Sequence, residues 1–373
     1  MTEFSDILDK LGREDNLRHI PDEYVSGALD LSSNDYLSLG ERCAEFYPEF
    51  FERFPDARFS SSASRLLSGQ QKYHLQLEEF LSSLYGRPSL LFNSGYHANV
   101  GCISALTLPS TLFVCDRLIH ASVVDGLRLA GARFVRFPHN DIIKLQGILD
   151  KETSSHDRVL VVTESIFSMD GDEAPLEDLV ALKKRYDNVF LYLDEAHAFG
   201  VRGERGLGLA EAYGLIDDFD LIIGTLGKAA ASAGAFIITS DVLKDFMVNT
   251  ARPFIFSTAL PPVNAAWSIL MIEKIIEMGK ERAHLAKLSL SFKERLEEIT
   301  GEKNSSESQI IPYITGDSAK ALSIASRLRE NGIIALPIRR PTVPPGGERI
   351  RFSLCSGMSR GDFDSLFKIL QEI

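Results

Sequence analysis

Short apolar runs recur along the middle of the chain, and Gly, Asp or Pro bounds most of them. Helix-like stretches separate several of these runs. The runs are rich in β-branched residues and lack in/out alternation, which is typical of strands buried on both faces of a mostly parallel sheet. We therefore predict an α/β domain in which helices cover such a sheet. The expected strands lie at residues 89–95, 111–116, 132–137, 158–164, 188–195, 220–228 and 234–240.

The pattern changes after the stretch "FIFSTALPP". A long helical stretch is expected over residues 263–299, and shorter strand and helix signals alternate from there to the last residue. Such a mixture predicts a compact α+β unit. The expected division is therefore an N-terminal arm at residues 1–30, a large α/β domain at residues 31–255 and a small α+β domain at residues 256–373.

Composition narrows the class of protein. The chain has 373 residues and a formal net charge of −12, which argues against broad nucleic-acid binding. The first residues have no basic segment followed by an apolar one, so we do not expect a secretory signal there, and no window approaches the roughly 18 apolar residues that span a membrane. The four cysteines form no CxxC pair. We expect a cytoplasmic protein with free thiols, no metal and no membrane segment.

An acid ends one of the buried strands, in "NVFLYLDEAHAFG". Burying the carboxylate of Asp194 is costly unless a cation accompanies it. That cation is either a nearby Arg or Lys, or a group on a ligand, and His197 could lie near the same ligand. A helix N-cap aspartate followed by an ordinary surface histidine is the alternative reading of these two residues.

A lysine follows another buried strand, in "DLIIGTLGKAAASAGAF". Lys228 stands among Gly, Ala and Ser, which leave space for a bulky ligand. A desolvated lysine has a lowered pKa and suits Schiff-base chemistry. The P-loop pattern fails here, because Ala229 follows the lysine. An ordinary surface lysine remains the alternative for this stretch taken alone.

Together, Asp194 and Lys228 match the needs of pyridoxal 5′-phosphate (PLP). The lysine would hold the cofactor covalently, and the aspartate would pair with the protonated pyridine nitrogen. "LLFNSGYHANVG" adds a possible phosphate site, because free N–H groups of Gly95 and Tyr96 would begin a helix. A glycine turn before a core helix explains that stretch equally well. His120 could stack on the cofactor, or simply cap a helix.

These motifs, taken together, resemble the α-oxoamine synthase family of fold-type I PLP enzymes. The motifs "HASVVDG", "ESIFSMDGD", "DEAHAFG" and "GTLGKA" occur in the family's order, and the match covers nearly the whole chain. The resemblance implies a PLP-dependent transferase with a mostly parallel, seven-stranded sheet. It also implies a homodimer with shared active sites.

The resemblance implies roles for individual residues. Lys228 would be the Schiff-base lysine, Asp194 the partner of the pyridine nitrogen, and His197 and His120 further catalytic residues. The expected cofactor contacts are Gly95, Tyr96, His120, Ser168, Asp194, His197, Thr225, Lys228 and Thr258, with Thr258 reaching the cofactor of the neighbouring subunit.

Further residues would serve the substrates. These are Arg18, Asn34, His120, Thr342 and Arg351, with Arg351 a candidate for the amino-acid carboxylate. Family members join a small amino acid to an acyl thioester with loss of CO₂.

The stretches "FPHND" and "IRRPTVPPGGERIRFSL" resemble those of family members that use L-alanine and a pimeloyl thioester, so the resemblance implies these substrates, with coenzyme A or acyl carrier protein as the carrier. Two other predictions remain open. One is a family relative that uses glycine with acetyl-CoA, or serine. The other is an aminotransferase-like PLP protein.

Overall fold

The computed structural model describes residues 2–20 and 27–372, and it divides the chain into two compact units. The larger unit comprises Asp35–Ser168 and Glu173–Arg282. The smaller comprises Met1–Asn34, Met169–Asp172 and Ala283–Ile373. The division therefore falls at 282–283 rather than at the expected 255–256, and the N-terminal residues group with the smaller unit. Residues 21–26 of the expected arm lie outside the described residues.

A seven-stranded sheet forms the centre of the larger unit, in the order β2-β8-β7-β6-β5-β3-β4. Only β8 runs antiparallel to its neighbours. Almost every residue of these strands is buried except in the edge strand β4, which confirms the mostly parallel, helix-covered sheet predicted from the apolar runs. The bounds are β2 (Ser89–Phe92), β3 (Thr111–Asp116), β4 (Arg133–Phe137), β5 (Arg158–Glu164), β6 (Val189–Asp194), β7 (Leu221–Thr225) and β8 (Ala235–Ile238).

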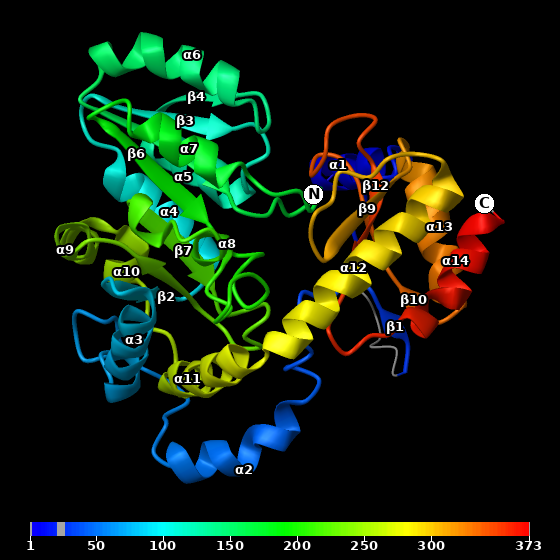
Figure 1. The fold of residues 1–373 in the computed structure, drawn as a ribbon, viewed down its shortest axis with the longest axis horizontal. Coiled ribbons are helices and arrows are strands. Elements are labelled where there is room, and N and C mark those ends of the chain that lie inside the picture. The colour runs from blue at the N-terminus through cyan, green and yellow to red at the C-terminus, as the bar shows by residue number, and fades with distance from the viewer. Residues whose placement is uncertain (1, 21–26, 373) are drawn as a thin grey trace. The chain divides into compact units, whose positions relative to one another are not determined.

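Helices pack along this sheet (Figure 1). Several begin at side-chain caps; the Ser94 hydroxyl, for example, accepts a hydrogen bond from the His97 N–H at the start of α4. The helices are α2 (Cys43–Arg53), α3 (Lys72–Tyr85), α4 (Gly95–Leu106), α5 (Ala121–Ala130), α6 (Ile142–Glu152), α7 (Leu176–Lys183), α8 (Leu209–Ala212), α9 (Asp241–Thr250), α10 (Arg252–Phe256) and α11 (Pro262–Glu277). The 3₁₀ turns are Thr153–Ser155 and Ile216–Asp218.

The core beneath the sheet fixes α4 and α5, the two helices that contribute to the site described below. Ile103, Val123 and Leu127 are fully or almost fully buried there. The two helices approach closely at Gly126, where an added Cβ would lie 3.0 Å from the Ile103 side chain. A larger residue at position 126 would push the helices apart, because packed cores have little spare volume.

The smaller unit combines helices with short strands, as expected for an α+β domain. β1 (Leu29–Asp30) pairs in parallel with β10 (Ile333–Ile334). β12 (Arg349–Ser353) lies between β11 (Leu336–Ile338) and β9 (Ile310–Ile314), antiparallel to both. The stretch expected as one helix at 263–299 is two helices, α11 and α12, because the helix breaks at Met278. The remaining elements are α1 (Thr2–Arg13), α12 (Gly279–Thr300), α13 (Ser318–Glu330), a 3₁₀ turn (Arg360–Phe363) and α14 (Asp364–Gln371).

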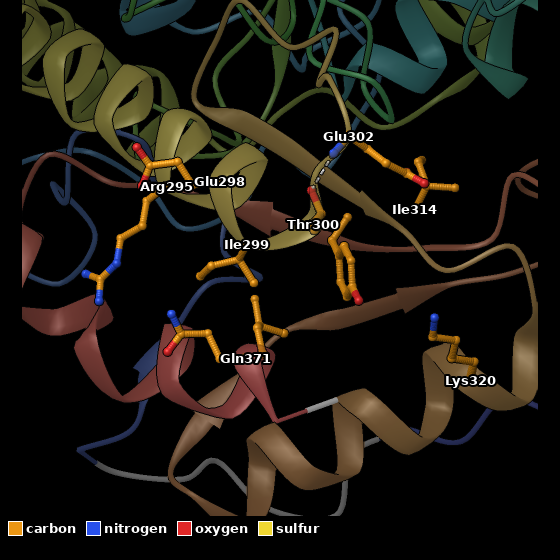
Figure 2. A pocket seen from close by; sticks show the side chains of 10 residues that line it. Arg295, Glu298, Ile299, Thr300, Glu302, Ile314, Lys320 and Gln371 are labelled. Carbon is orange, nitrogen blue, oxygen red and sulfur yellow. Dashed lines mark hydrogen bonds between the residues drawn. The ribbon is translucent and has the colours of Figure 1, made fainter.

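The smaller unit also contains a hollow of about 590 Å³. Figure 2 shows Arg295 and Glu298 extending beside it from α12, and Lys320 from α13. Solvated charges of both signs surround it, and none of the residues that the sequence marks for catalysis lies in it. Among the described residues, no helix is long and apolar enough to cross a membrane, and no cluster of His, Cys, Asp and Glu could hold a metal ion.

Candidate active site

The parallel strands β5, β6 and β7 are neighbours, so their carboxyl ends meet at one edge of the sheet. Their last residues are Glu164, Asp194 and Thr225. Open α/β sheets bind ligands at this edge. A cavity of about 160 Å³ lies here, in the larger unit. It is lined by Gly95, Tyr96, Asn99, His120, Glu164, Asp194, Ala196, His197, Thr225 and Lys228.

Lys228 lies on the loop after β7 and begins a chain of three polar side chains. Its Nζ is 2.8 Å from Nε2 of His197, and Nδ1 of the same ring is 2.6 Å from the hydroxyl of Tyr36. His197 and Tyr36 are buried, whereas Lys228 is half-buried. The chain holds the amine beside the cavity, which is the arrangement that covalent attachment of a carbonyl ligand needs.

Asp194 ends β6 and is held by donors on two sides. Its Oδ2 accepts a hydrogen bond of 2.8 Å from Nδ2 of Asn99, and its Oδ1 accepts one of 2.9 Å from the N–H of Ala196. The hydroxyl of Tyr192 in turn donates to Oδ1 of Asn99 over 2.7 Å, and this orients the amide. These donors fix the Asp194 carboxyl at the wall of the cavity, where it can face a cationic group.

Glu164 is a second carboxyl in the same cavity. It is opposite Asp194 in the pairing of β5 with β6, and only 3% of its surface is exposed. The N–H of Ser168 donates to Oε2 over 3.3 Å. Burial raises the pKa of Glu164 well above its ordinary value, and the negative charges of Asp194 and Asp116 add to this shift. The positive charge of Lys228 has the opposite effect.

His120 caps the first turn of α5 at the rim of the cavity. Its Nδ1 accepts a hydrogen bond of 3.3 Å from the N–H of Ser122 and lies 2.7 Å from the Ser122 hydroxyl. The neutral ring therefore carries its proton on Nε2. The helix cap predicted as one reading of His120 is present, and the ring also lines the cavity; its stacking on the cofactor stays a prediction.

The N-terminus of α4 provides Gly95 and Tyr96. The Tyr96 side chain is turned to α5, where its hydroxyl donates to Oδ2 of Asp125 over 2.6 Å. Tyr96 can therefore offer a ligand its backbone N–H and the edge of its ring, but its hydroxyl is engaged. The first N–H groups of a helix are suited to phosphate.

These residues fit PLP. The cavity combines an amine, a carboxyl group held by two hydrogen-bond donors, a histidine ring and a helix N-terminus. In that order, these groups are suited to the aldehyde, the pyridinium nitrogen, the ring face and the phosphate of PLP. Lys228 would hold the aldehyde carbon, and Asp194 would face the ring nitrogen.

The chain matches the family described as aminotransferase class I and II over residues 26–370. The chain belongs to this family. An 8-amino-7-oxononanoate synthase of Haemophilus ducreyi is 46% identical over 350 residues, which cover 92% of this chain and 90% of the relative. The α-oxoamine synthase resemblance predicted from the motifs is thereby confirmed.

Solved structures agree on the fold. A serine palmitoyltransferase variant from S. paucimobilis, with a bound PLP–myriocin aldimine, has a TM-score of 0.88 and 26% identity, and the match covers 99% of this chain and 96% of that one. The 8-amino-7-oxononanoate synthase of Francisella tularensis has a TM-score of 0.78 and 25% identity, covering 93% and 98%. The predicted fold-type I architecture is thereby confirmed for this member of the aminotransferase class I and II family.

Two residues expected at the cofactor do not line the cavity of this family member. Ser168 follows β5 and is half-buried, and its N–H is bound to Glu164. Thr258 is exposed, and its carbonyl accepts a hydrogen bond of 2.7 Å from Nδ2 of Asn93. The roles of both residues stay predictions.

The substrate residues other than His120 belong to the smaller unit, where they form two pairs. Arg18 donates to the Thr342 hydroxyl over 3.1 Å at the surface. Arg351 is buried on β12, and its guanidinium lies 3.2 and 3.3 Å from Oδ1 of Asn34. Within each pair, the two predicted substrate residues are therefore neighbours in the structure, although they are far apart along the chain.

Four lining or supporting residues were not assigned a role from the sequence: Tyr36, Asn99, Glu164 and Tyr192. Two signals could have found them. Asn99 stands one helical turn after Gly95 in the expected phosphate-binding helix, so it shares the face that carries the site. Glu164 ends a buried strand as Asp194 does. Tyr36 and Tyr192 gave no such signal, since tyrosines are common in cores.

Proposed function

We propose that the chain is a PLP-dependent acyltransferase that condenses L-alanine with a pimeloyl thioester. The products are 8-amino-7-oxononanoate, CO₂ and the free thiol carrier, and the reaction is a step of biotin synthesis. The observation that carries the proposal is Lys228 and Asp194 lining one cavity in a chain 46% identical to a named 8-amino-7-oxononanoate synthase.

Bound PLP supplies an electron sink for the carbanion that forms at the alanine Cα. The residues of the chain do the remaining work. Lys228 takes the α-proton and later returns one to the same carbon. Asp194 keeps the pyridine nitrogen protonated, and the Asn99 amide keeps Asp194 in place. His197 holds the lysine amine in position when no substrate is bound.

The carbanion attacks the thioester carbonyl and expels the thiolate. The resulting β-keto acid loses CO₂, and the proton is then restored at Cα. Holding the two substrates in attack geometry supplies up to roughly 7–11 kcal/mol of the barrier in well-oriented reactions. His120 would cover one face of the reacting group, and Arg351 would bind the alanine carboxylate.

A product assay tests the function. The purified enzyme is incubated with alanine and separate pimeloyl thioesters of coenzyme A and acyl carrier protein. We expect a ketone with the mass of 8-amino-7-oxononanoate and one CO₂ for each thiol released. Thiol release without that ketone would contradict the proposal. The rates of ketone formation from the coenzyme A thioester and from the acyl carrier protein thioester identify the preferred carrier.

Two alternatives follow from the relatives. A glycine-using 2-amino-3-ketobutyrate ligase would join glycine to the acetyl group of acetyl-CoA and keep the glycine carboxylate, so no CO₂ would accompany thiol release. A serine-using relative would resemble the serine palmitoyltransferase above. Comparing alanine, glycine and serine with short and long acyl thioesters separates the three. An aminotransferase-like protein would convert keto acids without any thioester.

The proposal includes a homodimer in the cytoplasm. Thr258 would reach the phosphate of the neighbouring subunit's cofactor, and free thiols such as Cys102 and Cys115 suit a reducing compartment. Mixing Lys228→Ala and Thr258→Ala chains tests the shared site. If sites are shared, mixed dimers regain one complete site; if each site is built from one chain, mixing restores nothing.

A further inference from the structure

Two buried carboxyls line one cavity, and they are not equivalent. Glu164 and Asp194 occupy paired positions on the adjacent strands β5 and β6, so both side chains leave the sheet on the same face. Neighbouring strands are only about 4.8 Å apart. A negative charge on the same face of an adjacent strand favours the neutral form of a buried carboxyl.

The two carboxyls differ in the hydrogen bonds that they accept. Asp194 accepts from Asn99 and from the N–H of Ala196, at 2.8 and 2.9 Å. Glu164 accepts only the longer contact from the N–H of Ser168, at 3.3 Å, and its Oε1 is buried with no partner among the described residues. Donors stabilise an ionised carboxylate, whereas a bare buried oxygen does not.

We propose that Glu164 is protonated in the folded protein and acts as a neutral hydrogen-bond donor inside the candidate active site. Its acidic O–H would bind an anionic oxygen of the cofactor or substrate that occupies the cavity. Asp194 would then be the single carboxylate facing the ring nitrogen. The inference rests on the proposed function for the identity of the occupant, but the protonation of Glu164 can be measured without any ligand.

The surrounding charges support this assignment. Burial and the carboxylates of Asp194 and Asp116 all favour the neutral form of Glu164, and the ammonium of Lys228 opposes them. Lys228 lies 2.8 Å from His197 and is held by that ring. His120 also lines the cavity, and a neutral imidazole adds no charge.

In this proposal Asp194 faces the cationic ring nitrogen and Glu164 donates a hydrogen bond, and a single carboxyl could not do both. An ionised acid stabilises a cation and accepts hydrogen bonds, whereas a neutral acid donates one. If Glu164 were ionised, it would compete with Asp194 for the cationic ring nitrogen and would repel a substrate carboxylate.

Difference infrared spectroscopy of the cofactor-free and cofactor-loaded protein tests the proposal. At about pH 9, where a carboxyl with a pKa of about 7 is ionised, we expect the C=O stretch of a protonated carboxylic acid in the wild type, its loss in Glu164→Gln, and its retention in Glu195→Gln. Glu195 is the matched control: it is equally buried, but two backbone N–H groups bind it and its pKa is about 7. Absence of the band from the cofactor-free wild type would overturn the proposal and leave the proposed function untouched.

A binding experiment tests the donor role. Glu164→Gln keeps a neutral donor of the same shape, so PLP affinity is expected to stay within about threefold of the wild type. Glu164→Leu removes the donor, and affinity is expected to fall about tenfold or more, as for a lost hydrogen bond to a charged group. A glutamine variant as weak as the leucine variant, with normal unfolding midpoints, would show that Glu164 acts as an anion.

Discussion

Asn99 and Asp194 are joined by a buried hydrogen bond of 2.8 Å, although one lies on α4 and the other at the end of β6. Tyr192 completes the link, because its hydroxyl donates to the Asn99 amide. The carboxyl that would meet the cofactor is therefore fixed by the same helix that would bind the phosphate. The packing of α4 on the sheet therefore also determines where the Asp194 carboxyl lies in the site.

Replacing Asn99 by Ala should weaken both the fold and the site. It leaves Asp194 Oδ2 and the Tyr192 hydroxyl without their partner, and burying unpaired polar groups costs about 1–3 kcal/mol. We expect a loss of that size in the free energy of urea unfolding, and about tenfold weaker PLP binding. Tyr192→Phe is the control: it keeps the bond to Asp194 and should cost about 1 kcal/mol with little change in PLP affinity. Equal PLP affinities in the wild type and Asn99→Ala would contradict the positioning role.

Lys228 should be the residue that carries the cofactor. Borohydride reduction of the PLP-loaded protein is expected to fix the cofactor on the peptide containing Lys228, and Lys228→Ala should abolish both the labelled peptide and the visible absorbance. The exposed Lys287 supplies the control, because Lys287→Ala should be labelled like the wild type. Labelling of any other lysine in the wild type would exclude the assignment.

Tyr36→Phe should affect catalysis through His197. The variant loses the hydroxyl that lies 2.6 Å from Nδ1, so the ring and the Lys228 amine are held less firmly. We expect kcat to fall about tenfold while KM for alanine changes little, together with a stability loss of about 1 kcal/mol. Tyr85→Phe removes a comparable buried bond, to the carbonyl of Leu207, and should lower stability without changing kcat. If the two variants lose kcat equally, Tyr36 has only a structural role.

Arg351 should set the affinity for alanine. A planar guanidinium can bind a carboxylate with two hydrogen bonds, whereas an ammonium cannot reproduce that geometry. Arg351→Lys is expected to raise KM for alanine about tenfold or more, since hydrogen bonds to charged groups contribute about 1.5–3 kcal/mol. Arg349→Lys, two residues away, alters a side chain already paired with Asp170 at 2.6 Å. It should lower stability and leave KM unchanged, and the reverse pattern would reject the prediction.

The sheet and the main site residues were predictable because both leave a local mark on the sequence. Uninterrupted apolar runs indicated buried parallel strands, and an acid or lysine at the end of such a run is too costly to be accidental. Asp194 and Lys228 are residues of this kind. The strand β8 was also predicted, but its antiparallel direction was not, because a buried apolar run looks the same in either direction.

The supporting residues escaped prediction for a physical reason. Tyr36 and Tyr192 act through hydroxyl groups whose partners are distant along the chain, and only the folded structure brings them to His197 and Asn99. The helix break at Met278 was also missed, because Gly279 alone is a weak signal inside a long helical pattern. Local sequence patterns thus predict the candidate reactive side chains, whereas their hydrogen-bond partners can be identified only in the folded structure.

Glu195 should make stability depend on pH. It is fully buried, and burial raises its pKa from 4.5 to about 7. A carboxyl with a raised pKa binds its proton more tightly in the folded chain, so its contribution to stability is present at low pH. That contribution is lost as the pH rises from about 4.5 to about 7, and it amounts to roughly 3 kcal/mol.

Glu195→Gln removes this titration and isolates the effect. Its amide keeps one acceptor for the N–H groups of Leu209 and Ala210, so a constant loss of about 1 kcal/mol is expected at every pH. The wild type should therefore lose stability relative to the variant between pH 4.5 and 7, and the difference should be constant above that range. Urea unfolding of both proteins at several pH values measures it. A difference that does not vary with pH would mean that the pKa of Glu195 is the same in the folded and the unfolded chain, its desolvation offset by its hydrogen-bond donors.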